Sequence, residues 1–190
     1  MNVKKLTTMA MLVAVSIVLV WIGRFIPFFS MAFLEYDPAD IPILIGAFAF
    51  GPVAGLMITV VASLVQTLTV SQTSGVYGLI MHIIATGTYV LVAGNIYTKK
   101  KTRGRAVIAL VSGTLAMTVV MIGANLVVTP MFMGMPASAI VDYLIPVIIP
   151  FNLLKAGING LVTFVLYKPL SRVIHNFEEH GSKQKVGEAR

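Results

Sequence analysis

Charged residues are scarce in this chain and cysteine is absent. Only 11% of its 190 residues are charged, 57% are hydrophobic, and the mean hydropathy is +0.92. A soluble domain carries about 25% charged residues, so this set is too small to cover a water-exposed globule. The composition also excludes a disordered chain, a coiled coil, a collagen and a secreted disulfide scaffold. It favours a membrane protein with room for about six helices of ~20 residues and for no separate catalytic or nucleotide-binding domain.

The charges that are present lie at the ends of long apolar runs. No Asp, Glu, Lys or Arg occurs at 41–98 or at 106–141. A net charge of +7 could suit a nucleic-acid partner, but charges confined to the ends of apolar runs indicate membrane topology instead. The main clusters are Lys4 with Lys5, Arg24, the acidic segment from Glu35 to Asp40, the basic segment 99–105, Asp142 and the tail from Lys168.

The apolar runs predict one all-α domain at 1–176 with six transmembrane helices, followed by a disordered tail at 177–190. The first run has no small-residue cleavage motif, so we interpret it as a retained helix rather than a signal peptide. The run at 40–71 would form a helix of ~48 Å, longer than a ~30 Å hydrocarbon core, and Gly51 with Pro52 divides it. The expected spans are the N-terminal run to 23, then 39–50, 53–71, 76–98, 106–129 and 150–172.

Loop charges predict that both termini are cytoplasmic. Cytoplasmic loops carry an excess of Lys and Arg. With six spans, Lys4, Lys5, the segment 99–105 and the basic tail fall on one side, and the acidic residues at 35–40 and Asp142 fall on the other. Five spans would put the segment 99–105 opposite the N-terminal lysines, so six spans are favoured.

No group of residues suggests an enzyme, a cofactor or a metal site. The three histidines, His82, His175 and His180, show no metal-ligand spacing with carboxylates, and no phosphate-binding GxxxxGK[ST] loop occurs. We therefore expect no catalysis and no use of ATP by the chain through that motif.

Lys155 is the most informative single residue, because it is the only charged side chain expected at membrane depth within a span. A lysine there usually faces a protein interior, a water-filled cavity or a ligand. The alternative is that its long side chain extends to the outer interface. Asn152 and Asn159 lie on the same helical face, one turn to either side.

Polar residues from three spans are expected to share a depth with Lys155. The alternating span directions place Tyr77, His82, Asn125 and Asn152 in the outer half of the membrane, near Tyr36 and Asp40 of the acidic first loop. A cavity with apolar walls and a few polar groups is the general form of a small-molecule site. The alternative is that Asn125 and His82 only form hydrogen bonds between helices.

Taken together, these segments resemble the substrate-binding S components of energy-coupling-factor (ECF) vitamin transporters over about residues 6–175. The resemblance includes Ala10 and Ala14 in the first span, the acidic first loop, and FGPVAG at 50–55. Within that family, the segments DPADIPILIGAFAFGPVAG at 37–55 and PFNLLKAGING at 150–160 are most similar to the riboflavin-specific members.

The resemblance implies a membrane subunit that binds riboflavin, or its phosphate, from outside a bacterial cell. It implies delivery through a coupling transmembrane subunit, which Ala10 and Ala14 would contact, and two ATPase subunits. The first outer loop would act as a lid over the ligand. Leu34, Leu79 and Ile83 could cover the flavin ring, while Asn125, Asn152 and Lys155 offer donors to its oxygens.

Three other functions remain open at the level of sequence. The chain could be an S component for another vitamin, although a single Trp, Trp21, is unfavourable for a thiamine cation, which would favour several aromatic rings and a carboxylate. It could be a self-sufficient secondary transporter or small channel, which the lack of inverted repeats disfavours. It could also be a membrane scaffold whose polar residues only join helices.

Overall fold

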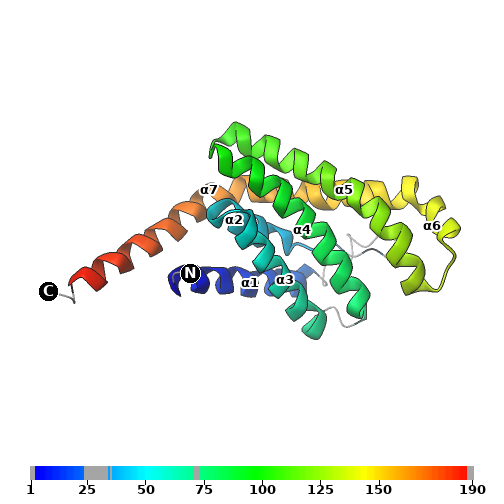
Figure 1. Ribbon diagram of the computed structural model, residues 1–190, viewed down its shortest axis with the longest axis horizontal. Helices are drawn as coiled ribbons and strands as arrows, with labels where there is room; N and C mark the ends of the chain where they lie inside the picture. The colour runs from blue at the N-terminus through cyan, green and yellow to red at the C-terminus, as the bar shows by residue number, and fades with distance from the viewer. Residues whose placement is uncertain (1–2, 24–33, 35, 71–72, 188–190) are drawn as a thin grey trace.

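The computed structural model describes residues 3–23, 34, 36–70 and 73–187, with side chains to residue 170, as a bundle of helices (Figure 1). Arg24 and Glu35, two of the charged residues near the first loop, lie outside the described residues. The helices are α1 (Val3–Gly23), α2 (Asp40–Phe50), α3 (Pro52–Thr69), α4 (Gly75–Lys99), α5 (Arg103–Met133), α6 (Ala137–Tyr143), the π-helix η2 (Leu144–Ile148) and α7 (Ile149–Gly187).

The break predicted at Gly51 and Pro52 is confirmed. Gly51 has φ +96°, a backbone conformation that favours glycine. Its N–H still donates to the Ala47 carbonyl at 2.8 Å and so closes the last turn of α2. Pro52 begins α3, where its missing N–H costs no helical hydrogen bond. The two helices therefore meet at a tight turn that holds them side by side.

Five segments of the described chain are long and apolar enough to cross a membrane, and α2 is a sixth, shorter apolar helix. The five are Val3–Gly23, Pro52–Thr69, Gly75–Lys99, Arg103–Met133 and Ala137–Leu170. With 11 residues, α2 rises only ~16 Å, about half of a ~30 Å hydrocarbon core. The loop that precedes α2 therefore enters the bundle at about half depth.

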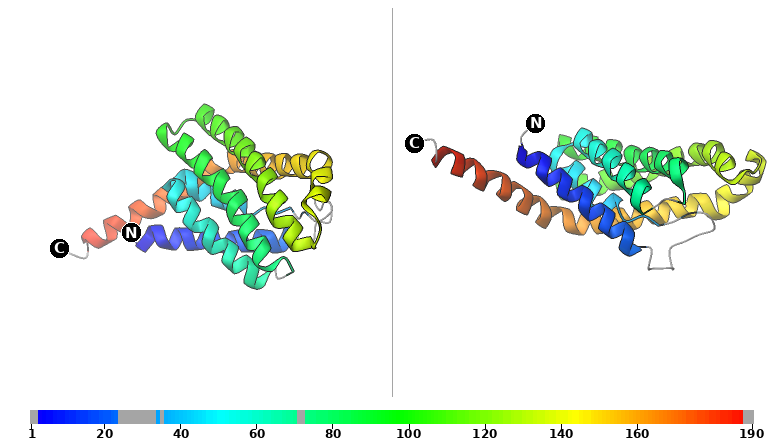
Figure 2. Two further views of the ribbon diagram at one scale, coloured as in Figure 1. Left: turned by 45° about the vertical axis from the view of Figure 1, so that its right-hand side comes forward. Right: turned by 90° about the horizontal axis from the view of Figure 1, so that it is seen from below.

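The ends of the helices agree with the predicted alternation of direction. Figures 1 and 2 place the N-terminus, the α2–α3 turn, the α4–α5 turn and the far end of α7 at one end of the bundle. The α3–α4 and α5–α6 connections lie at the other end (Figure 1). Six crossings follow from this arrangement, and the side of the membrane that each end faces remains an expectation from the charges.

Two expected boundaries differ from the structure. The fifth span was predicted to end at 129, but α5 continues through Pro130 to Met133 and ends at Gly134, whose φ is +65°. The last span was predicted to end at 172, and the structure assigns helix as far as Gly187; the disorder expected at 177–190 stays a prediction. Helix α7 passes through Pro169, so a proline near the expected end of the span does not stop it.

The short helix α2 forms the centre of the packed core. Ile43, Leu44 and Ala47 are fully buried between the surrounding helices. Near the end of α2, the ring of Phe48 stacks on Tyr97 of α4 with centroids 4.1 Å apart and meets Tyr167 of α7 edge to face at 5.5 Å. These contacts fix the position of α2 and with it the residues at its beginning, where the cavity described next is found.

Candidate functional site

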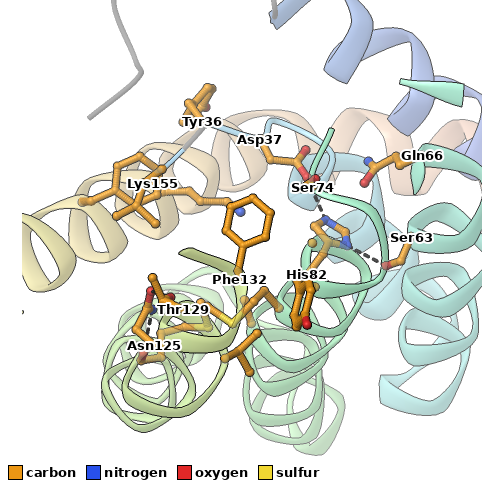
Figure 3. Close-up of a pocket in the computed structure, with 18 of the residues that line it drawn as sticks. Tyr36, Asp37, Ser63, Gln66, Ser74, His82, Asn125, Thr129, Phe132 and Lys155 are labelled. Atoms are coloured by element: carbon orange, nitrogen blue, oxygen red, sulfur yellow. Dashed lines mark hydrogen bonds and ion pairs between the residues drawn. The ribbon is translucent and has the colours of Figure 1, made fainter. Parts of the chain in front are cut away.

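A cavity of about 500 Å³ lies beside the start of α2, and residues from α1, the first loop, α3, α4, α5 and α7 line it (Figure 3). Its volume falls within the ~300–1,000 Å³ of sites for small organic ligands. Its walls are mostly apolar, with polar groups on several sides. The polar lining residues are Tyr36, Asp37, Ser63, Gln66, Thr67, Thr73, Ser74, Tyr77, His82, Asn125, Thr129, Asn152 and Lys155.

Asp40 forms the centre of a buried polar network behind the cavity. Its carboxylate is fully buried at the first turn of α2, where a negative charge is favoured by the helix dipole. Thr86 donates to Asp40 Oδ1 at 2.5 Å, and Asn159 donates to Oδ2 at 2.8 Å. Lys155 Nζ lies 3.9 Å from the same Oδ2. The network therefore joins α2 to α4 and to α7.

Asp37 and His82 form a second pair at the cavity surface (Figure 3). Asp37 Oδ2 lies 2.9 Å from His82 Nε2, and His82 Nδ1 lies 2.6 Å from the Ser63 hydroxyl. Asp37 Oδ1 also accepts from the Ala39 N–H at 2.8 Å, just before α2 begins. Burial alone would raise the pKa of Asp37, but the charges of His82 and Lys155 and these hydrogen bonds hold it well below its usual range.

Asn159 holds the first loop against α7. Its Nδ2 donates to the Asp37 carbonyl at 2.9 Å as well as to Asp40, and its Oδ1 accepts from the Tyr36 hydroxyl at 2.6 Å. Burial, followed by the charges of Asp40 and Asp37, raises the pKa of Tyr36 to about 12. Tyr36 therefore keeps its proton at neutral pH and remains a hydrogen-bond donor.

Asn125 and Asn152 line the cavity while bonding to their own helices. Asn125 Nδ2 donates to the Met121 carbonyl at 2.8 Å, and its Oδ1 accepts from Thr129 at 2.9 Å. Asn152 Nδ2 donates to the Ile148 carbonyl at 2.8 Å. Because each amide carries two N–H donors and an oxygen with two lone pairs, both side chains are held in place with capacity left for a ligand.

The apolar lining includes rings and flexible side chains. Tyr77 of α4 and Phe132 of α5 face each other with ring centroids 5.7 Å apart. Met81 and Met121 are among the lining residues and can adjust to an irregular ligand surface. The remaining apolar lining residues are Val20, Leu34, Ala85, Val128 and Phe151.

The structure brings together most of the residues that the sequence singled out. Lys155, Asn152, Asn125, Tyr36, Leu34, Tyr77 and His82 all line the cavity. Asp40 does not line the cavity but lies buried behind the lining, with its Oδ2 3.9 Å from Lys155 Nζ. Leu79 and Ile83 are not among the lining residues, whereas Gly78 and His82 are. Leu79 and Ile83 each follow one of these two by one position, which turns their side chains about 100° around α4 and away from the cavity.

Several lining residues were missed from the sequence. Gln66 is the clearest, since its Nε2 is buried with no hydrogen-bond partner among the described residues. An amide in the charge-free third span was a signal that could have identified it. Ser63, Phe132 and Phe151 carry no comparable signal, because serine and phenylalanine are ordinary in transmembrane helices.

Two further expectations concern the surface and metals. Ala10 and Ala14 both lie exposed on α1, next to exposed Met11 and Val15. No group of three metal-ligating side chains occurs in the described part of the chain. What the lining of the cavity offers an organic molecule is apolar contact and hydrogen bonds.

Comparison with known protein families gives a match over most of the chain. The profile of the ECF transporter, substrate-specific component family matches residues 4–167. A solved structure described as the S component of a bacterial ECF transporter has a TM-score of 0.75 and 31% sequence identity. That similarity covers 90% of this chain and 97% of the other.

Three curated bacterial proteins are similar over nearly their whole length. Riboflavin transporter RibU of Staphylococcus aureus is 30% identical over 90% of this chain and 92% of its own. Riboflavin transporter FmnP of Bacillus subtilis is 30% identical over 87% and 90%. Riboflavin transporter RibU of Streptococcus thermophilus is 28% identical over 91% and 85%.

Proposed function

We propose that this chain, which belongs to the family of ECF transporter substrate-specific components, binds riboflavin in the cavity beside α2 and delivers it through an ECF complex. The names of the three curated relatives support riboflavin as the ligand. The observation on this chain that carries the proposal is the lining itself, in which apolar walls and polar groups together enclose about 500 Å³.

The distribution of polar groups suits a flavin. The isoalloxazine ring is large and flat with a polar edge, and its ribityl chain carries hydroxyl groups. Figure 3 shows Lys155 and Asn125 on one side of the cavity and Ser63 and Gln66 on the other. Donors on both sides can satisfy the two ends of the molecule, since leaving a buried ligand oxygen unpaired costs about 1–3 kcal/mol.

The charges of the site favour a neutral ligand over a cation such as thiamine. The two carboxylates, Asp37 and Asp40, are each paired with a basic side chain, His82 and Lys155 respectively. A bound cation would have to compete with these pairs. Trp21, the single Trp of the chain, is not among the lining residues.

Delivery requires a surface for the coupling subunit, and α1 offers one. Ala10 and Ala14 are exposed with a spacing of four residues, which lets another helix approach closely. The chain contains no phosphate-binding loop, so energy from ATP would come from the two ATPase subunits of the complex.

The visible absorption spectrum of the protein purified in detergent from riboflavin-producing cells tests the proposed ligand. The proposal expects flavin absorption bands that elute with the protein, and chromatography of the ligand released by denaturation should identify riboflavin. A different vitamin in the released fraction would contradict the riboflavin assignment but not the cavity. Protein that is colourless and stays colourless after incubation with riboflavin would contradict the proposal.

A further inference from the structure

A second hollow lies on the outer face of the bundle and shares no lining residue with the cavity beside α2. It is an apolar groove of about 410 Å³ between α5 and α7, with α4 beneath it. The residues along its edges are largely exposed, among them Val111 and Leu115 on α5 and Leu161 on α7. The full lining is Tyr89, Val107, Leu110, Val111, Thr114, Leu115, Gly157, Gly160, Leu161 and Phe164.

Two glycines of α7 give the groove its depth. A Cβ added at Gly160 would lie 2.5 Å from the Tyr89 hydroxyl, so the Tyr89 side chain reaches from α4 to the backbone of α7 there. A Cβ added at Gly157 would meet nothing within 4 Å, so this position opens into empty space. The polar groups at the floor are satisfied, because Tyr89 donates to the Ala156 carbonyl at 3.0 Å and Thr114 donates to Tyr89 at 3.2 Å. The groove therefore offers apolar contact only.

The groove has the length of one lipid leaflet. From Val107 to Leu115 the rise along α5 is ~12 Å, compared with ~15 Å for half of a hydrocarbon core. A groove of this depth that opens onto a bilayer faces acyl chains, since they are the solvent at that level.

Both helices that form the groove carry a basic residue at the same end of it. Arg103 lies one turn before Val107 on α5, and Lys168 lies one turn after Phe164 on α7, each on the groove face. The helices run antiparallel (Figure 1), and a Cβ at Gly160 would lie 3.7 Å from that of Leu110. Measured along the helix axes from this contact, Arg103 lies ~10 Å away and Lys168 ~12 Å away, both toward the same end of the groove.

Neither cation is paired with a carboxylate among the side chains that the structure describes. The ion pairs found among the described side chains all lie in the network beside α2 and involve neither Arg103 nor Lys168. The next acidic residue along α7 is Glu178, ten residues or ~15 Å past Lys168. A positive potential therefore marks the end of an apolar groove.

We propose that this groove binds one acyl chain of an anionic phospholipid, whose phosphate lies between Arg103 and Lys168. The apolar floor takes the chain and the cations take the headgroup charge. This site is separate from the cavity beside α2, and the inference does not depend on which ligand that cavity holds.

Native mass spectrometry of the purified protein, titrated with phosphatidylglycerol or phosphatidylcholine of the same chains, measures the binding. Each Lys or Arg beside an anionic headgroup contributes about five-fold in affinity. We therefore expect phosphatidylglycerol to bind the wild type about 25-fold more tightly than phosphatidylcholine, from two such contributions. Equal affinity for the two lipids would overturn the proposal.

Filling the groove tests the position of the acyl chain. Gly157→Leu places a side chain in the open space and should abolish binding of phosphatidylglycerol at concentrations that saturate the wild type. Gly123→Leu is the matched control, because Gly123 is also exposed with nothing within 4 Å of an added Cβ, but it lies outside the groove. Full binding by Gly157→Leu, or the same loss in both variants, would contradict the site.

Removing the charges tests the headgroup contact. The double variant Arg103→Gln, Lys168→Gln should lose the preference for phosphatidylglycerol, whereas Lys100→Gln, Lys101→Gln, with the same change in net charge, should keep it. This pair remains informative if Gly157→Leu does not fold. A preference that falls equally in both double variants would indicate net charge rather than a site. A dimer that Gly157→Leu dissociates would show instead that a second copy covers the groove, and would overturn the lipid assignment.

Discussion

Lys155 Nζ lies 3.9 Å from Asp40 Oδ2 in the interior of the bundle. The lysine is 8% exposed and the aspartate is fully buried. Because little water reaches this interior position, each charge is compensated by the other and not by solvent. The pair also links α7 to the first turn of α2. Because Lys155 also lines the cavity, it can serve the fold and a ligand at the same time.

This pairing predicts that Lys155→Met destabilises the protein. Removing one partner of a buried ion pair costs about 3–5 kcal/mol, and we expect the lower end, because Asp40 keeps its bonds from Thr86 and Asn159. Denaturant unfolding in detergent without ligand measures the change. Lys101→Met, in the exposed α4–α5 turn, is the control. An unchanged or higher unfolding midpoint for Lys155→Met would place this lysine at the lipid interface.

A double-mutant cycle separates the pair from other effects of the substitution. Asp40→Asn keeps the shape of the side chain and removes its charge. The double variant should be less destabilised than the sum of the single variants, by about 0.5–3 kcal/mol for groups in contact. Strict additivity would mean that the two charges do not interact.

The lowered pKa of Asp37 predicts a dependence of stability on pH. Since the folded-state pKa lies below the ordinary value of 3.8, the unfolded chain binds more protons as the pH falls through that value. The stabilisation from Asp37 is thus fully present above about pH 4 and is lost below it. The unfolding free energy of the wild type should converge on that of Asp37→Asn as the pH drops. A difference between these two proteins that stays constant as the pH falls would contradict the lowered pKa.

The absence of cysteine makes membrane sidedness directly measurable. A single cysteine at Ser138, exposed in α6, should react with a membrane-impermeant maleimide in intact cells. A single cysteine at Lys101, in the basic α4–α5 turn, should react only after the membrane is permeabilised, as the excess of Lys and Arg predicts. The parent protein provides the blank. The same labelling behaviour at both sites would contradict the six-crossing topology.

The exposed alanines of α1 predict a separation of binding from transport. Ala10→Leu and Ala14→Leu should leave riboflavin binding by the purified subunit within about two-fold of wild type, because both side chains lie outside the core. Uptake by cells that express the whole ECF complex should fall strongly, since close helix approach is blocked. Ala137→Leu, exposed at the start of α6, is the control. Equal losses of binding and uptake would mean that these alanines pack within the subunit.

Much of the fold could be predicted because its determinants are local. Glycine and proline at 51 and 52 end one helix and begin the next by backbone chemistry alone, and the structure agrees. The end of α5 was not predictable in the same way. Pro130 lies inside that helix, and neighbouring helices in a membrane protein can compensate the hydrogen bond that proline removes.

The sequence could predict which site residues lie at a similar level along the bundle, but not how each helix is rotated about its own axis. Span direction sufficed to bring Asn125 and Lys155 to one cavity. The facing of Leu79 depends on the rotation of α4 about its axis, which a wholly apolar turn does not specify. The full burial of Asp40 and the partial burial of Asp37 depend on α2 being only 11 residues long, which draws the loop before it into the bundle.

Titration of riboflavin with the purified wild-type protein, followed by flavin fluorescence, tests the central claim most directly. The account predicts saturable quenching at one riboflavin per chain. Lys155→Met, measured on its folded fraction, should bind about 10–200-fold more weakly, since a lost charge-assisted hydrogen bond costs about 1.5–3 kcal/mol. Lys101→Met should bind as the wild type does. No saturable quenching by folded wild-type protein, or equal affinities for all three proteins, would contradict the account.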